Sequence, residues 1–214
     1  MNCLMDNDVI LKLAAIQLLQ DWKSIAVKKG GEIRVLSTAK YFFGGKKIVL
    51  RYGEAGVQSA VTFACEAKPV CDEDNPQDFH TLSSLPGIDI GEAVLFSSAV
   101  KLTDYMIVSG DKIALQSLQE GKPCVQICQA LKGRVIAFEQ VLLVLVRRGN
   151  FSAIREKVVS GEKIDKVLQV AFGLGLETTP EKAIEALEAY IAGLRAKTGN
   201  LLISDKSLEG LLSN

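Results

Sequence analysis

The sequence has no long apolar run, no net charge and few residues that could coordinate a soft metal. Its longest apolar stretch, residues 135–146, is interrupted by Glu139 and Gln140, and no stretch approaches the roughly 20 apolar residues of a membrane-spanning helix. The 25 basic and 25 acidic residues cancel, so bulk charge gives no reason to expect a nucleic acid or a membrane as partner. Any binding of nucleic acid must therefore depend on a local site.

Zinc ligands are scarce as well. His80 is the only histidine, and the five cysteines form no C-x-x-C pair; they are Cys3, Cys65, Cys71, Cys124 and Cys128. A structural zinc site needs four sulfur or imidazole ligands at close spacing. Cys71 and His80 could suggest a thiol nucleophile, but both lie in a polar stretch without an orienting partner. We expect buried free thiols in a reducing compartment instead.

The first residues do not have the pattern of a secretory signal. Polar Asn2 follows Met1, and the acids Asp6 and Asp8 interrupt any apolar segment. We therefore expect a soluble, cytoplasmic protein. The 214 residues are 48% apolar, which is enough for a substantial core. This length allows one large domain, or one domain plus an appendage.

Two stretches show the same order of features, which is an apolar strand, an acid and then an amphipathic helix. In residues 2–10 the acid is Asp6, and in residues 105–112 it is Asp111, after a Ser-Gly turn. In open α/β sheets, ligands bind at the carboxyl ends of the strands. Two parallel strands at the centre of one sheet would bring Asp6 and Asp111 into the same crevice.

Strand and helix patterns alternate as far as residue 149, and only helical patterns follow it. Further strands are predicted at residues 33–36 and 125–128, and a strongly apolar helix at residues 135–148. Alternation favours a parallel sheet flanked by helices. We therefore predict an α/β domain over residues 1–149 and an all-helical extension over residues 150–214.

Between these elements, residues 66–87 are polar and rich in turn-forming residues. We expect a surface loop there, with one short helix near residues 76–82. Several glycine-rich stretches lack the spacing of phosphate-binding loops. The apolar faces of the helices after residue 150 favour packing on the core together with some self-association.

Three carboxylates stand at strand-to-helix junctions or in first helical turns: Asp6, Glu92 and Asp111. Such acids repel one another when they converge, unless a cation is present or some are protonated. Oxygen-only ligation suits Mg²⁺ or Mn²⁺ rather than zinc. A metal of this kind can activate water and neutralise charge on a phosphate. Against this stands the plain alternative that acids are common at helix starts because of the helix dipole.

Four segments resemble the motifs of PIN-domain proteins. Residues 4–10 are similar to the first motif, an apolar strand followed by an aspartate. Residues 91–93 are similar to the central acidic motif, and residues 99–112 resemble the final motif closely. Residues 123–149, read as a strand and then an apolar helix, also fit the end of the family's domain. The resemblance covers about the first two-thirds of the chain.

This resemblance implies a compact parallel sheet with an acidic pocket that binds Mg²⁺ or Mn²⁺. It implies metal-dependent endonuclease action, usually on RNA, and many bacterial members are the toxin half of a toxin–antitoxin pair, with an antitoxin-like protein as partner. By the same resemblance Asp6, Glu92 and Asp111 would be catalytic metal ligands. Asp8, in a place where the family usually has Asn, is a fourth candidate at the metal site, where it could hold a ligand or a water. Asp89 and Asp104 are reserve candidates.

One departure from the family pattern leaves other functions open. The family usually has another acid in the helix after the second strand, but residues 37–43 contain none. Lys40 in that helix could stand in for the cation, which would give an inactive PIN-like binding or regulatory protein. A different α/β phosphohydrolase is a third hypothesis, because Asp6-x-Asp8 is compatible with a nucleophile at the same pocket.

Overall fold

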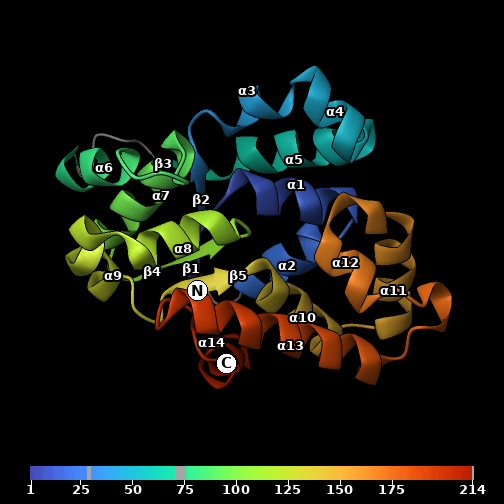
Figure 1. Ribbon diagram of the computed structural model, residues 1–214. Helices are drawn as coiled ribbons and strands as arrows, with labels where there is room; N and C mark the ends of the chain where they lie inside the picture. Colours follow the sequence, from blue (N-terminus) through green and yellow to red (C-terminus); the bar gives the residue numbers. More distant parts are fainter. Residues whose placement is uncertain (28–29, 71–75, 214) are drawn as a thin grey trace.

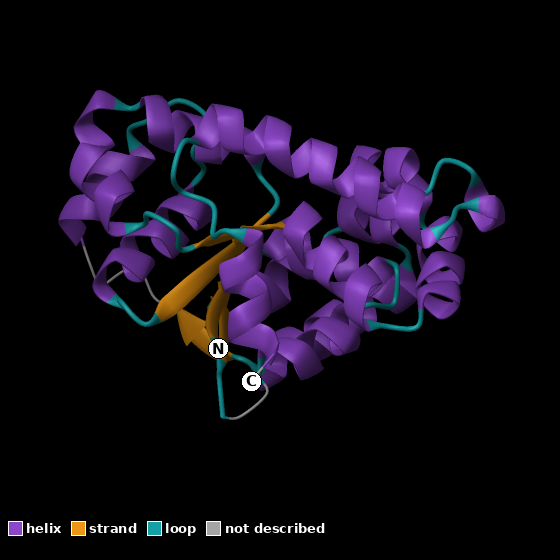
Figure 2. Cartoon of the chain, turned by 90° about the horizontal axis from the view of Figure 1, so that it is seen from below, coloured by secondary structure: helices purple, strands orange, loops and turns teal. Residues whose placement is uncertain are grey.

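The structure is a computed structural model, and it describes residues 1–27, 30–70 and 76–213. In this part of the chain a parallel sheet has the strand order β3-β2-β1-β4-β5. Its strands are β1 (Asn2–Met5), β2 (Ile33–Leu36), β3 (Lys68–Val70), β4 (Tyr105–Ser109) and β5 (Val135–Ala137). The predicted α/β class, with a central parallel sheet flanked by helices, is confirmed (Figure 2).

The chain order of the strands reverses at β1. From β1 the chain first builds β2 and β3 to one side, and then β4 and β5 to the other. β1 and β4 are therefore neighbours, with Met5 paired to Val108, and the backbone N–H of Asp6 donates to the carbonyl of Val108 at 2.9 Å. A crevice forms outside the carboxyl ends of the strands at such a reversal.

Helices connect and cover the strands (Figure 1). α7 packs against β1, β2, β3 and β4, and α1 packs against α5 and β4. The helices before residue 150 are α1 (Asn7–Ala15), α2 (Leu19–Ala26), α3 (Ala39–Phe43), α4 (Lys46–Tyr52), α5 (Glu54–Glu66), α6 (Pro76–Ser83), α7 (Ile90–Lys101), α8 (Lys112–Glu120), α9 (Val125–Ala130) and α10 (Phe138–Arg148).

The strand predicted at residues 125–128 is wrong, because this stretch is helix α9. Pro123 lies in a short 3-10 turn just before it, and proline favours the first turn of a helix. The fifth strand, β5, instead occupies the first residues of the helix predicted at 135–148. All three residues of β5 are buried, and a fully buried strand shows no alternation that would separate it from a buried helix.

The polar stretch at residues 66–87 contains the helix that was predicted there, α6, and also a strand that was not. β3 is short and lies at the edge of the sheet, where Pro69 is tolerated because one side of the strand needs no ladder hydrogen bond. Three residues of this composition give no readable strand pattern.

The helices after residue 150 pack onto the α/β part. They are α11 (Phe151–Ser160), α12 (Lys166–Ala171), α13 (Pro180–Thr198) and α14 (Asp205–Ser213), and α13 contacts both α8 and α10. The segment after α13 then runs along β5, where Val135 N–H donates to the carbonyl of Leu201 and Ile203 N–H to that of Val135. This part of the chain therefore joins the edge of the sheet, and the predicted boundary at residue 150 stays a prediction.

No helix in the described ranges is both long enough and apolar enough to cross a membrane. The longest, α13, has a charged or polar residue at most of its exposed positions.

Candidate functional site

The crevice at the β1–β4 reversal contains the predicted acids. A cavity of about 460 Å³ opens there. Asp6 lines it from the end of β1, Asp111 from the turn after β4, and Glu92 from the first turn of α7. Asp8 and the reserve candidate Asp89 line it as well. The structure therefore brings residues from three distant segments of the sequence into one acidic cavity.

The other reserve candidate, Asp104, lies elsewhere. It precedes β4, so it is at the amino end of the sheet, where its Oδ2 accepts a hydrogen bond from Asn2 Nδ2 at 2.7 Å. It is not among the residues that line the cavity.

The acids in the cavity raise one another's pKa. Asp6 is buried, and this burial, together with the charges of Asp8 and Asp89, raises its pKa to about 7. Burial likewise raises the pKa of Glu92 to about 8; the Asp89 N–H opposes this shift, and the charges of Asp111 and Asp89 add to it. Like charges in a poorly hydrated cavity need either protons or a cation to coexist.

Three of these acids also form hydrogen bonds at the starts of two helices, α7 and α8. Asp89 Oδ1 accepts from Glu92 N–H, and Glu92 Oε2 accepts from Asp89 N–H, both at 2.8 Å, which is a capping box at the start of α7. Asp111 Oδ1 accepts from the backbone of Ile113 and Ala114 at the start of α8. These bonds fix the side chains, and the second oxygen of each has no hydrogen bond within the described residues.

The carboxylate oxygens of the cavity are suitable ligands for a hard divalent cation, but their side chains lie too far apart to share one. Carboxylate oxygens are the ligands that Mg²⁺ and Mn²⁺ prefer. Across the part of the chain that the structure describes, however, no three His, Cys, Asp or Glu side chains stand close enough together to hold an ion. A bound ion would have to draw Asp6, Glu92 and Asp111 closer together than they lie here.

Asp8 has different partners from the other acids. Its Oδ1 accepts from the hydroxyl of Tyr52 at 3.0 Å, and its Oδ2 pairs with Lys12 Nζ at 2.5 Å. Lys12 is buried and also pairs with Asp165 Oδ2 at 2.6 Å. Burial lowers the pKa of Lys12, but the two carboxylates outweigh it and the net shift is upward, so Lys12 stays cationic. With both oxygens engaged, Asp8 is placed to support the site rather than to bind an ion.

The lysine in this network is not the one that the sequence suggested. Lys40 is exposed, its Nζ lies 5.0 Å from the centre of the Tyr41 ring, and it is not among the residues that line the acidic cavity. The i,i+4 spacing of Asp8 and Lys12 was a readable signal for an ion pair on one helix face. Asp165 gave no such signal, because it lies in the helical part that sequence patterns did not connect to the site.

The cysteines do not form part of the site. The predicted burial holds for Cys3 and Cys124, whose thiols have pKa values raised by burial to about 12 and about 11, while Cys65 is exposed. Cys71 lies outside the described residues, so its suggested pairing with His80 is not placed.

Comparison of this chain with protein-family models, with characterised proteins and with solved structures finds no match. The resemblance to PIN-domain proteins therefore stays a prediction from sequence motifs.

Proposed function

We propose that this protein is a PIN-like, metal-dependent endoribonuclease whose acidic cavity acts on RNA phosphodiester bonds. One observation carries the proposal: Asp6 and Asp111 end neighbouring strands at the sheet's reversal point, and buried Glu92 faces the same cavity. The upward pKa shifts of Asp6 and Glu92 support it, because a divalent cation would remove the repulsion that causes part of them.

In this proposal Asp6, Glu92 and Asp111 hold Mg²⁺ or Mn²⁺, with Asp89 beside them. When bound, such an ion activates a water molecule and neutralises charge that develops on the phosphate. The chain's own residues bind and orient the substrate. Arg51 lines the cavity and supplies a cation for a phosphate oxygen, and Ser37 and Thr38 supply hydroxyl groups at the end of β2, where the family usually has an acid nearby.

The test is cleavage of RNA in the presence of Mn²⁺ or Mg²⁺ by the wild type and by the Asp6→Asn variant. Asp104→Asn is the matched control, because it removes one aspartate charge at the opposite end of the sheet. The proposal predicts cleavage by the wild type and by Asp104→Asn, with a loss of at least about a hundredfold in Asp6→Asn. Equal activity in all three proteins, or no cleavage by any of them, contradicts it.

A second candidate is a PIN-like binding or regulatory protein without nuclease activity. The hydrogen bonds at the helix starts favour this function, because capping of α7 and α8 is enough to explain why Asp89, Glu92 and Asp111 stand where they do. This function predicts that RNA or a protein partner binds without being cleaved, and that Mn²⁺ does not bind saturably.

The third hypothesis, another α/β phosphohydrolase, needs a free nucleophile at the pocket. Tyr52 and Lys12 engage both oxygens of Asp8, so the nucleophile of this hypothesis would be Asp6, which lines the same cavity. Hydrolysis of a small phosphate ester such as p-nitrophenyl phosphate, together with no cleavage of RNA, would favour this hypothesis over the nuclease.

A further inference from the structure

One segment of the chain has a charge unlike the rest of this neutral protein. Residues 37–53 contain four cations, Lys40, Lys46, Lys47 and Arg51, and no acid. We call this segment, which includes α3 and α4, the basic arm. It also exposes large apolar side chains, with Tyr41 75% and Phe42 52% accessible to solvent.

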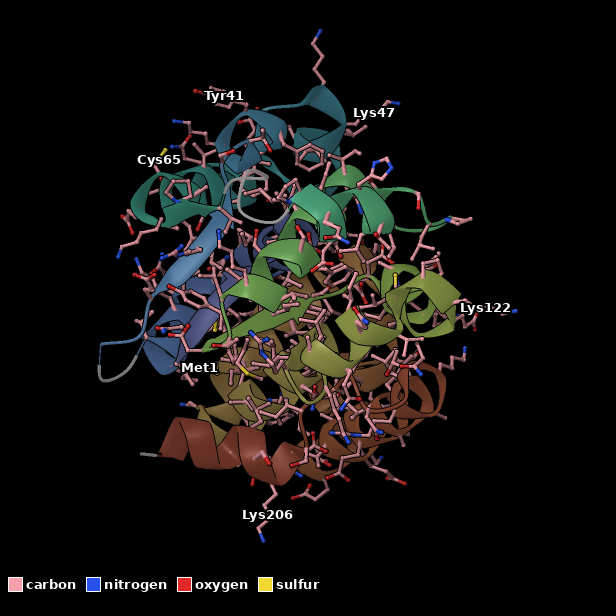
Figure 3. The ribbon with its side chains drawn as sticks, turned by 90° about the vertical axis from the view of Figure 1, so that its left-hand side faces the viewer. Met1, Tyr41, Lys47, Cys65, Lys122 and Lys206 are labelled. Atoms are coloured by element: carbon pink, nitrogen blue, oxygen red, sulfur yellow. The ribbon has the colours of Figure 1, made fainter. Side chains whose placement is uncertain are left out.

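The basic arm forms one wall of the acidic cavity. Phe42 and Arg51 line that cavity together with Asp6 and Glu92. Figure 1 shows α3 and α4 together beyond α5, and Figure 3 shows Tyr41 and Lys47 at the same end of the molecule, while Lys206 lies at the opposite end. The arm thus continues outward from the cavity as an exposed, positively charged surface.

Ion pairing within the fold does not explain these cations, although Arg51 Nη2 donates a hydrogen bond to the carbonyl of Ile164 at 3.3 Å. Within the described chain, none of the four cations has a carboxylate partner at ion-pair distance. Lys46 and Lys47 stand in the first turn of α4, where a positive charge opposes the helix dipole. Tyr41 and Phe42 are exposed, whereas the next residue, Phe43, is fully buried and anchors α3.

We propose that the basic arm binds single-stranded RNA and leads it into the acidic cavity, an inference that rests on the proposed nuclease function. Lys46, Lys47 and Arg51 contact phosphates along the strand, and the rings of Tyr41 and Phe42 stack on unpaired bases. Cations that follow a backbone and exposed aromatic rings are the two features that bind single strands with little dependence on sequence. Paired bases would not offer their faces to these rings.

The positive charge of the basic arm favours RNA over a second copy of this chain as its binding partner. A symmetric contact between two basic arms would place the same cations against each other, and no acid in the arm could compensate for them. A polyanion has the complementary charge, and its contact with lysine and arginine releases counterions, which gives a favourable term at low salt.

The test is fluorescence anisotropy with the full-length chain in EDTA, so that binding is measured without cleavage. The probes are a labelled single-stranded oligoribonucleotide of about 12 nucleotides, the same sequence as a duplex, and single-stranded DNA. Three double variants are compared with the wild type. Lys46→Ala with Lys47→Ala removes phosphate contacts, Tyr41→Ala with Phe42→Ala removes stacking, and Lys122→Ala with Lys206→Ala is the control on exposed lysines away from the arm (Figure 3).

The proposal predicts tighter binding of the single strand than of the duplex. The lysine variant should weaken binding and lower the salt dependence, log Kd against log salt concentration, by about 1.4, since each phosphate contact on a single strand contributes about 0.7. The aromatic variant should weaken binding at least about fivefold with the salt dependence unchanged. The control variant should bind like the wild type. If single-stranded DNA binds as tightly as RNA, the arm contacts the phosphates and bases and not the 2′-hydroxyl groups. That result still supports the arm as the surface that binds single strands.

Three results would overturn the proposal: no RNA binding by the wild type, equal binding by all variants, or tighter binding of the duplex. Sedimentation that shows a dimer lost in the aromatic variant, with RNA binding intact, would assign the surface to self-association instead. Failure in this test can be told apart from a failure of the nuclease proposal. A wild type that binds RNA through the arm but does not cleave it with Mn²⁺ contradicts only the catalytic function.

Discussion

Lys12 and Asp165 form a largely buried ion pair between the first helix and the helical part of the chain, with 2.6 Å between Lys12 Nζ and Asp165 Oδ2. Their side chains are 8% and 15% accessible to solvent. Because Lys12 also holds Asp8 at the edge of the acidic cavity, this pair connects the helices after residue 150 to the site.

Replacing Asp165 should destabilise the protein. Asp165→Asn leaves Lys12 buried with one carboxylate instead of two, and the expected loss in the free energy of unfolding is about 1–3 kcal/mol. The measurement is urea unfolding. Asp21→Asn is the control, because Asp21 pairs with Lys157 at 3.0 Å on the surface, where such pairs contribute about 0–1 kcal/mol. Equal losses for the two variants would show that the buried pair has no special weight.

The contribution of the Lys12–Asp165 pair to stability should depend on pH. Burial raises the pKa of Asp165, but the charge and hydrogen bond of Lys12 outweigh it, so the net pKa is lowered. A carboxyl whose pKa is lowered by folding makes its full contribution to stability at pH values above its pKa in the unfolded state, about 3.9. This contribution is lost as the pH falls through the pKa of the folded state.

The stability difference between wild type and Asp165→Asn should therefore be constant from neutral pH down to about pH 5 and should shrink below about pH 4. Unfolding curves of both proteins across this range measure it. A difference that grows toward acid pH would mean that the sign of the pKa shift is wrong.

Gly110 lies against the same network, which predicts a steric effect. A Cβ at this position would stand 3.0 Å from Asp8 Oδ2 and 3.4 Å from Lys12 Nζ. Gly110→Ala should push these groups apart and lower stability by about 1–3 kcal/mol. The control is Gly193→Ala in α13, where a Cβ meets no atom within 4 Å. That variant should gain about 0.5–1 kcal/mol from alanine's helix propensity, and thermal unfolding of both variants distinguishes the two effects.

The parts of this architecture that depend on local order could be predicted from the sequence. β1 and β4 are apolar and are each followed by an acid, so the placement of Asp6 and Asp111 at one edge of the sheet followed from the parallel arrangement of their strands. The helix at residues 76–82 was predicted within its turn-rich stretch, and the start of α13 has the usual capping residues, Thr179 and then Pro180.

The parts that depend on long-range contacts could not be predicted. β5 is buried along its whole length and runs directly into α10, so its residues read as helix. The apolar helical pattern that follows Asp6 is divided between α1 and α2, where Gln17 adopts a positive φ of 56° that its residue type did not indicate. The pairing of Lys12 with Asp165 depends on tertiary packing, which no spacing in the sequence encodes.

The central claim is that Asp6, Glu92 and Asp111 share a divalent cation at the reversal point of the sheet. The most direct measurement is a calorimetric titration of Mn²⁺ into the wild type, Asp6→Asn, Asp111→Asn and the control Asp104→Asn. The account predicts saturable binding by the wild type and by Asp104→Asn, and loss of that binding in both cavity variants. No saturable binding by the wild type, or the same binding in Asp6→Asn, would contradict it.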